Sequence, residues 1–273
     1  MKIPKTNWLI LAGITLVALI AWPFVSIPRA TASHVYVAPV LPDYSYRDKT
    51  VAFYEKRVKD DPQDQISARM LAGEYMQRYR ETVDVGDIQR GMHQAARSLA
   101  LQRQNNSAAE GEIASGYYAL HKFRDALKYE TMAHLEQPDD SNAPAQMALL
   151  EMEMGKFNTA FRDIGIAQHI KSDAGVWSAQ ARYDELTGHL DQAKVLMQRA
   201  SQTTDEVSDN SAEARAWYHY RLGQMAFSSG DNIEAQRQER IAVTDFPGFE
   251  MGYRALARFC WGVKDWACAQ DAA

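Results

Sequence analysis

Residues 222–235 read LGQMAFSSGDNIEA, and this stretch decides the fold class. The small residue Gly223 follows an aliphatic residue, and Ala235 is a second small residue beyond the polar centre of the stretch. Two helices can approach each other closely only where their side chains are small. The stretch therefore predicts a helical hairpin whose two helices touch at Gly223 and Ala235.

The same arrangement recurs along the chain. The expected first helices carry small residues at Ala72, Ala114, Ala148, Ala181, Gly223 and Ala257, at steps of 42, 34, 33, 42 and 34 residues. The expected second helices carry Met92, Ala126, Ala160, Ala193, Ala235 and Ala269, at steps of 34, 34, 33, 42 and 34 residues. Apolar residues are spaced by three and four from Asp48 onward, which is typical of helices. The two series predict an all-α fold built as an α-solenoid of helical hairpins.

This series resembles the tetratricopeptide repeat (TPR) family, whose units of about 34 residues carry a small residue in each helix and often a closing proline. The closest matches are Leu222-Gly223 with residues 230–235 and Pro247, and residues 154–157 with Ala160 and Ala167, preceded by Pro138. The resemblance covers residues 48–273. It implies about six repeats, of which the last is incomplete, because the sequence stops a few residues into the second helix of that unit.

In members of this family the first helices of successive units line a concave groove that binds peptides or protein segments. Carrying the groove-facing positions over by alignment gives Arg69, Tyr118, Arg182, Tyr220, Gln224, Arg254 and Arg258. Arginine and tyrosine often anchor interfaces, so the resemblance implies a ligand with acidic and apolar groups. The alternative is that these arginines pair with neighbouring acids such as Glu74, Glu151 and Glu185.

Two stretches depart from the regular period. Residues 79–87, YRETVDVGD, contain about eight extra residues, and their glycine and acids favour a loop between two helices. Residues 203–211, TTDEVSDNS, are acidic and lack large apolar groups, which indicates a solvated link. Near the end of the sequence, we expect Trp261 and Trp266 to be partly exposed, because no polar capping helix follows them.

The N-terminus is a candidate membrane segment. Residues 8–27, WLILAGITLVALIAWPFVSI, contain no charge over a length that matches a hydrocarbon core. Residues 1–32 are therefore either an uncleaved transmembrane anchor or a secretory signal that is cleaved near Ala32. Two lysines precede the apolar run, so in both cases the repeat domain is expected on the extracytoplasmic side. Two prolines in residues 33–47 predict an extended linker.

Composition and motifs narrow the function further. After residue 32 the chain holds 27 basic and 35 acidic side chains, a formal charge of −8, which argues against a nucleic-acid partner. The two cysteines, Cys260 and Cys268, match no redox or zinc motif, and we expect two packed thiols, with a disulfide as the alternative. No sequence motif for a catalytic centre, a metal or a phosphate loop occurs. We therefore expect a protein that is not an enzyme and that uses no cofactor.

These observations predict a membrane-tethered or exported scaffold that binds a protein or peptide partner in the groove of its solenoid. Two alternatives remain open. The chain is a docking or regulatory segment of a larger enzyme, or it is a structural protein that self-associates through its C-terminal repeat.

Overall fold

The structure, a computed structural model, describes residues 42–207 and 210–272, and within these ranges it contains helices and turns but no strand. The chain enters through the 3-10 helix η2 (Asp43–Tyr46) and helix α2 (Arg47–Asp60). Paired helices follow: α3 (Gln65–Thr82) with α4 (Val85–Leu101), α5 (Ser107–Ala119) with α6 (Phe123–Glu136), α7 (Asn142–Glu153) with α8 (Phe157–Ile170), α9 (Ala174–Leu186) with α10 (Leu190–Glu206), α11 (Ala212–Ser228) with α12 (Asn232–Asp245), and α13 (Glu250–Gly262) with α14 (Trp266–Asp271). The predicted all-α class is confirmed.

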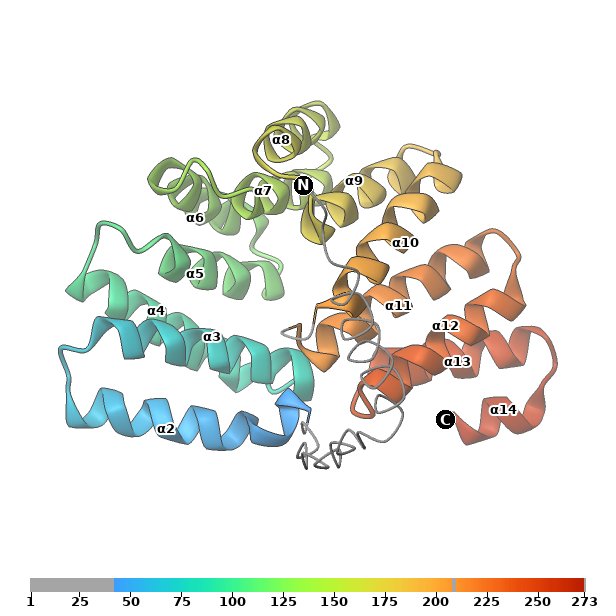
Figure 1. The fold of residues 1–273 in the computed structure, drawn as a ribbon, viewed down its shortest axis with the longest axis horizontal. Helices are drawn as coiled ribbons and strands as arrows, with labels where there is room; N and C mark the ends of the chain where they lie inside the picture. The colour runs from blue at the N-terminus through green and yellow to red at the C-terminus, as the bar shows by residue number, and fades with distance from the viewer. Residues whose placement is uncertain (1–41, 208–209, 273) are drawn as a thin grey trace, which may run out of the picture. The chain divides into compact units, whose positions relative to one another are not determined.

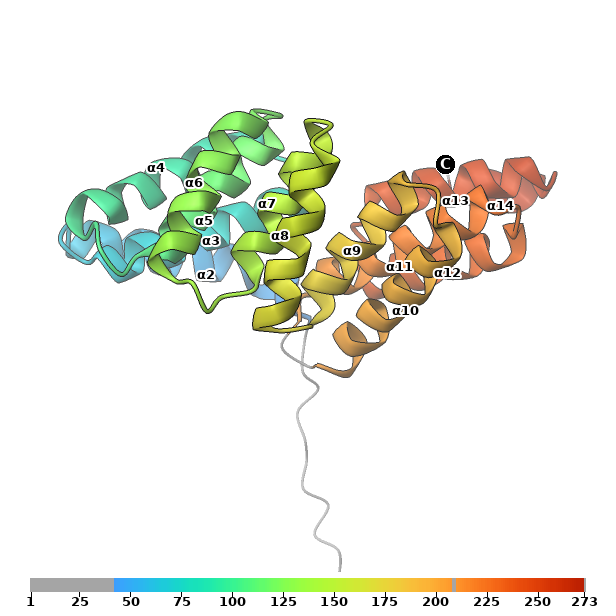
Figure 2. The same cartoon turned by 90° about the horizontal axis from the view of Figure 1, so that it is seen from above.

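Each pair forms a hairpin that packs against the next one (Figure 1). The first helices of neighbouring hairpins also contact one another, as α3 does with α5, α7 with α9, and α11 with α13. The second helices are not packed together in this way, so the stack curves with its first helices on the inner side (Figure 2). This curvature creates a concave surface along the first helices, where the sequence predicts the groove residues.

The small residues lie where the helices of a hairpin touch, as the sequence predicts. The buried members of the first series are Gly223 and four alanines that are at most 1% exposed, namely Ala72, Ala114, Ala148 and Ala181. The members of the second series that are fully buried are Ala126, Ala160, Ala193 and Ala235. Ala257 and Ala269 are only half-buried, because they belong to the last hairpin of the stack.

The turn inside five hairpins uses a residue with a positive φ at the same place. These residues are His121 (56°), Gly155 (73°), Gly188 (89°), Gly230 (80°) and Lys264 (63°). A left-handed residue reverses the chain within two or three positions, and glycine adopts this conformation without steric cost. The short turn is therefore a repeated feature, and two units build it without glycine.

The two 42-residue steps reflect longer helices rather than longer loops. Helices α3 and α4 have 18 and 17 residues, whereas α5 and α6 have 13 and 14. About one helical turn is thus added to each helix, which keeps the same face toward the core. The loop expected at residues 79–87 is wrong, because only two of its residues lie outside helices. The link expected at residues 203–211 is shorter than predicted, since α10 continues to Glu206 and itself has 17 residues.

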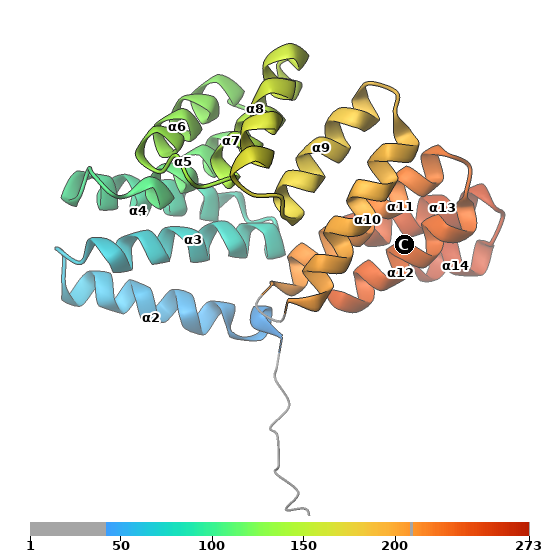
Figure 3. The same cartoon turned by 45° about the horizontal axis from the view of Figure 1, so that its top comes forward.

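The first described residues pack on the fifth hairpin, which brings η2 close to the start of α11 (Figure 3). The backbone amide of Ala212 donates a hydrogen bond of 2.9 Å to Asp43 Oδ1. The rings of Tyr44 and Phe246 lie 5.2 Å apart. Residues 43–46 therefore differ from the extended linker that the prolines predicted, because their aromatic and acidic side chains find partners on α11 and on the residue after α12.

A disulfide between Cys260 and Cys268 joins α13 to α14. The expectation of two packed thiols is therefore wrong, and the alternative of a disulfide is confirmed. Helix α14 has six residues, which is too short to be stable alone. The covalent link adds to the N-cap at Asp265, whose side chain accepts a hydrogen bond from the amide of Cys268. Trp261 and Trp266 are 67% and 53% exposed, as the sequence predicts.

The candidate membrane segment, residues 8–27, lies outside the described residues, as do residues 1–41 in general. Among the helices that the structure does describe, none combines the length and the apolar character needed to cross a bilayer.

Candidate binding groove along the first helices

Charged and aromatic side chains from four first helices come together on the concave side. Arg182 on α9 pairs with Glu185 at 3.0 Å and lies 3.9 Å from Glu153 on α7. Arg221 on α11 contacts the same Glu185 oxygen at 2.5 Å. These ion pairs connect three neighbouring hairpins. We call Tyr118, Glu153, Arg182, Glu185 and Arg221 the charged ladder.

Tyr118, on α5, completes the charged ladder at its N-terminal end. Its side chain is 42% exposed, yet the surrounding helices raise the pKa of its hydroxyl by desolvation, and the charge of Glu153 raises it further. Arg182 and Arg221 act on the same hydroxyl in the opposite direction. The structure therefore brings Tyr118 close to Glu153, Arg182 and Arg221, and the binding role of Tyr118 and Arg182 stays a prediction.

A second group of predicted residues lies one hairpin further along. Arg258 on α13 donates a hydrogen bond of 2.6 Å to Gln224 Oε1 on α11. Gln224 in turn donates to Glu239 Oε1 at 3.3 Å. Glu239 is fully buried, and desolvation raises its pKa to about 9. The guanidinium of Arg258 also lies 5.3 Å from the ring centre of Phe227, so it is fixed by both contacts.

Arg254 borders a cavity of about 330 Å³ between the end of α3, the start of α11 and the start of α13. The cavity is also lined by Tyr79, Glu81, Glu213, Trp217 and Phe249. Arg254 itself forms an ion pair with Glu250 on its own helix. The lining of the cavity therefore combines aromatic rings with carboxylates and two arginines, Arg80 and Arg254, which suits a small mixed apolar and polar group.

The remaining two predicted residues do not join these groups. Tyr220 packs edge-on against Phe249, with ring centres 5.7 Å apart, and belongs to the core around Ala216. Arg69 is half-buried on α3, and it forms no ion pair with another residue of the described ranges. The seven predicted residues are thus not one continuous site.

Sequence reasoning missed two members of the charged ladder, Arg221 and Glu153. Arg221 follows the predicted Tyr220, and one residue turns a helical side chain by about 100°. Tyr220 therefore faces the core, whereas Arg221 contacts Glu185. Glu153 lies 35 positions after Tyr118, whereas the repeat step of 34 leads to the buried Met152, so the period alone does not identify Glu153. The alternative that these arginines pair with nearby acids holds for Arg182 and Glu185.

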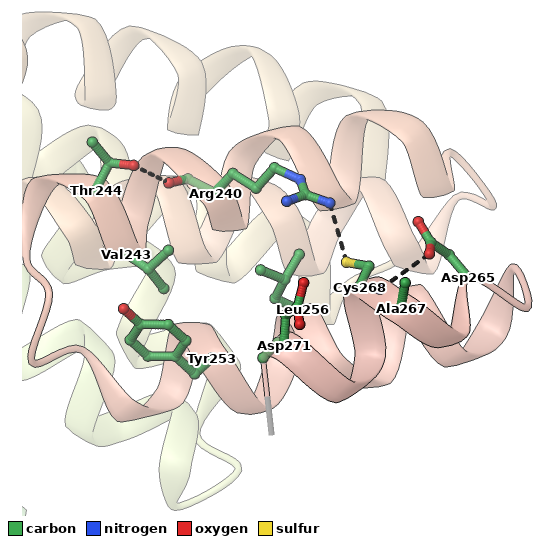
Figure 4. A pocket seen from close by; sticks show the side chains of 10 residues that line it. Arg240, Val243, Thr244, Tyr253, Leu256, Asp265, Ala267, Cys268 and Asp271 are labelled. Carbon is green, nitrogen blue, oxygen red and sulfur yellow. Dashed lines mark hydrogen bonds between the residues drawn. The ribbon is translucent and has the colours of Figure 1, made fainter.

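A further cavity, of about 580 Å³, lies among α12, α13 and α14 (Figure 4). Val243, Tyr253 and Leu256 form its apolar wall. Arg240 extends along it, and its guanidinium lies 3.1 Å from Cys268 Sγ. This cavity is separate from the charged ladder and is located at the last hairpin of the stack.

Comparison with known proteins supports the fold. No protein-family model matches the chain, and no curated protein matches its sequence. The APC/C hetero-tetramer Cut9–Hcn1 superposes with a TM-score of 0.68 at 12% sequence identity, covering 84% of this chain and 42% of that chain. A tetratricopeptide repeat protein from Parabacteroides merdae superposes with a TM-score of 0.57 at 14% identity, covering 84% and 87% of the two chains.

The fold is a TPR-like α-solenoid. The human IFIT1 dimer with PPP-AAAA gives a TM-score of 0.64 at 17% identity, and the match covers 84% of this chain and 54% of that chain. This TPR-like chain therefore spans about half the length of the Cut9 and IFIT1 chains. At these identities the similarity establishes the arrangement of the helices and nothing about the ligand.

Proposed function

We propose that this TPR-like chain is a scaffold that binds a protein or peptide segment along the charged ladder, with its N-terminus serving as a membrane anchor or an export signal. The observation that carries the proposal is the convergence of α5, α7, α9 and α11 on Tyr118, Arg182 and Arg221. Arginine and tyrosine provide large contact surfaces with little loss of side-chain entropy. In Cut9–Hcn1, the similar solenoid is part of a protein hetero-tetramer.

The chemistry of the charged ladder defines the kind of partner. Both Arg182 and Arg221 are held by the single carboxylate of Glu185. A carboxylate of the ligand can compete with Glu185 for Arg182, because the side chain of Arg182 is 33% exposed. We infer a partner segment with acidic and apolar side chains, held in a groove that is largely formed before binding.

The test is a crosslinking pull-down from native membranes with the tagged full-length chain. The groove variant is Arg182→Glu combined with Arg221→Glu. The control variant is Arg124→Glu combined with Lys128→Glu, which makes the same change of charge on exposed positions of α6, one of the outer helices. Circular dichroism of each purified variant checks that the helices are retained.

A partner that is captured by the parent chain and the control, and lost with the groove variant, supports the proposal. Equal capture by all three chains would reject the charged ladder as the binding site. Recovery of the bait alone in all three would instead favour self-association, or a docking role within a larger enzyme.

The proposed export is supported by the Cys260–Cys268 disulfide, because disulfides persist mainly in oxidising compartments. Thiol labelling of the native protein before and after reduction tests the redox state in the cell. Fractionation tests the anchor: Leu16→Arg places a charge in the middle of residues 8–27 and should move the chain from the membrane pellet to the soluble fraction. An unchanged membrane fraction would argue against a role for this segment.

Self-association is the second candidate, and Trp261 with Trp266 favours it. These exposed rings contact each other with centres 4.8 Å apart and form an apolar patch on the last hairpin. Large exposed aromatic patches often mark protein contacts. Sedimentation of the chain and of Trp261→Ser with Trp266→Ser across micromolar concentrations tests this, since only a dimer through the patch would dissociate in the variant.

A further inference from the structure

Three potential metal ligands meet at the junction of the fourth and fifth hairpins. His219 on α11 places Nε2 3.3 Å from Asp205 Oδ2, near the end of α10, and 3.8 Å from Asp245 Oδ2, at the end of α12. All three ligand atoms lie within 4.8 Å of one another. The cluster is separate from the charged ladder and from both cavities described above.

The imidazole of His219 is held in a defined orientation. His219 is 8% exposed, and its Nδ1 lies 2.6 Å from Gln238 Oε1. The amide nitrogen of Gln238 donates to Glu234 Oε1 at 2.7 Å, which fixes the amide so that its oxygen faces the histidine. An amide oxygen only accepts, so Nδ1 carries the proton. In the neutral imidazole, the lone pair is then on Nε2 and points at the two carboxylates.

We propose that Asp205, His219 and Asp245 bind a divalent transition-metal ion of the zinc class. Ligand atoms at about 2.0 Å from a tetrahedral Zn²⁺ lie about 3.3 Å from one another. The distance from His219 Nε2 to Asp205 equals this value, whereas the distance to Asp245 of 3.8 Å would shorten when the metal binds. One nitrogen and two carboxylate oxygens suit zinc, with water as the fourth ligand. The hydrogen bond from Nδ1 to Gln238 is the outer contact that orients metal-binding histidines in proteins.

The surroundings of the cluster fit this assignment. Asp205 has a 40% exposed side chain and gives an ion access from solvent, whereas the Asp245 side chain is 27% exposed. A bound cation would balance the negative charge of the two carboxylates, which both face the same histidine.

The three ligands come from three helices, so a metal ion would connect α10 to α11 and α12 across the link that begins at Val207. This site has no sequence signal, because spacings of 14 and 26 residues match no metal-binding motif. The consequence is mechanical: metal binding would hold the two hairpins in one relative position. We expect it to stabilise the folded chain by an amount that grows with the logarithm of the free metal concentration once this exceeds the Kd.

The test is calorimetric titration of chelator-treated full-length protein with Zn²⁺, together with Co²⁺ absorption to report tetrahedral geometry and thermal unfolding with and without metal. We expect one ion per chain, a higher Tm with Zn²⁺, and at least tenfold weaker binding in His219→Gln, Asp245→Asn and Asp205→Asn. Gln238→Met should weaken binding by about 10–100-fold, because it leaves the ligands but removes the orienting contact.

The control is His169→Gln with Asp191→Asn, which changes the same residue types away from the cluster and should bind as the parent does. Asp205→Asn is exposed, so it remains informative if His219→Gln fails to fold. Absence of zinc binding by the parent would overturn the proposal. Binding of equal strength in the parent and in Asp205→Asn would also overturn it, since it would show adventitious metal only.

Discussion

The carboxylate of Glu239 lies against Gly223, where an added Cβ would come within 2.6 Å of Glu239 Oε1. This contact explains why the fifth hairpin carries glycine at the position where other hairpins carry alanine. The second helix of that hairpin places a buried acid opposite it, in the space that Ile164 and Met197 occupy in the two preceding units. The small residue of one helix is thus matched to a large residue of its partner.

Gly223→Ala should lower the free energy of unfolding by about 1–3 kcal/mol, because the new methyl group overlaps a fully buried side chain. Urea unfolding of the purified chain measures the change. In a Glu239→Ala background the same substitution should be neutral or stabilising, since alanine favours helix over glycine by about 1 kcal/mol. Equal destabilisation in both backgrounds would show that the contact with Glu239 is not the cause.

Stability should fall as pH rises, because two buried carboxyls have raised pKa values. Desolvation raises the pKa of Glu130 to about 8 and that of Glu239 to about 9. The unfolded chain releases these protons near the ordinary value of 4.5, so it binds fewer protons than the folded chain between that pH and the folded pKa. The stability that these two carboxyl groups contribute is therefore lost progressively as the pH rises from the unfolded-state pKa to the folded-state pKa.

Glu239→Gln should remove most of the pH dependence that is due to Glu239, and the stability of this variant relative to the parent should increase by about 4 kcal/mol between pH 5 and pH 8. Denaturant midpoints at the two pH values measure this difference. Glu234→Gln, a change of the same type on the same helix, is the control, because the pKa of Glu234 is lowered by Arg237 and it should show no such gain. A constant difference between Glu239→Gln and the parent would contradict the raised pKa.

Asp87 should be among the most sensitive positions of the first hairpin. It is 1% exposed and accepts two hydrogen bonds of 2.8 Å from Arg78, with a further contact to Arg90. Asp87→Ala leaves both arginines without this partner and should cost about 3–5 kcal/mol. Thermal unfolding measures the loss. Asp48→Ala removes the 87% exposed partner of the same Arg78 and should cost less than about 1 kcal/mol.

Replacing His121, the left-handed residue in the turn between α5 and α6, by glycine should stabilise the protein. His121 has φ near 56° where three other hairpins use glycine. A left-handed non-glycine residue costs about 1–2 kcal/mol, which is partly offset by the lower chain entropy of a non-glycine residue when unfolded. His121→Gly should therefore raise the free energy of unfolding by about 0.5–1 kcal/mol, and Gly155→Ala should lower it. If both changes lower stability, the turn geometry is not what limits this position.

The sequence predicted the hairpins and their small-residue contacts correctly because these features are local. Ala126 and Ala160 recur at the repeat period, and the side chains that touch them lie three or four positions apart on one helical face. The loop expected at residues 79–87 failed for a related reason. Glycine and acids favour a loop, but one extra helical turn on α3 and α4 buries Asp87 against Arg78, and tertiary contacts outweigh local preference.

The candidate site was only partly predictable. The alignment named Tyr118 and Arg182, which the structure brings into the charged ladder, but it named Tyr220 and not the adjacent Arg221, because a shift of one residue turns the side chain to another face. Glu239 and its raised pKa had no sequence signal, since burial depends on what packs against it.

By itself, the sequence determined the all-α class, the repeat period and the positions where helices touch, because helix and turn preferences act over a few residues. Only the tertiary structure decided that Asp43 caps the amide of Ala212 and that Asp205, His219 and Asp245 meet. These contacts depend on the rotation between successive hairpins, which accumulates over the stack. The period of a sequence repeat does not contain that rotation, because it is set by side-chain packing between hairpins.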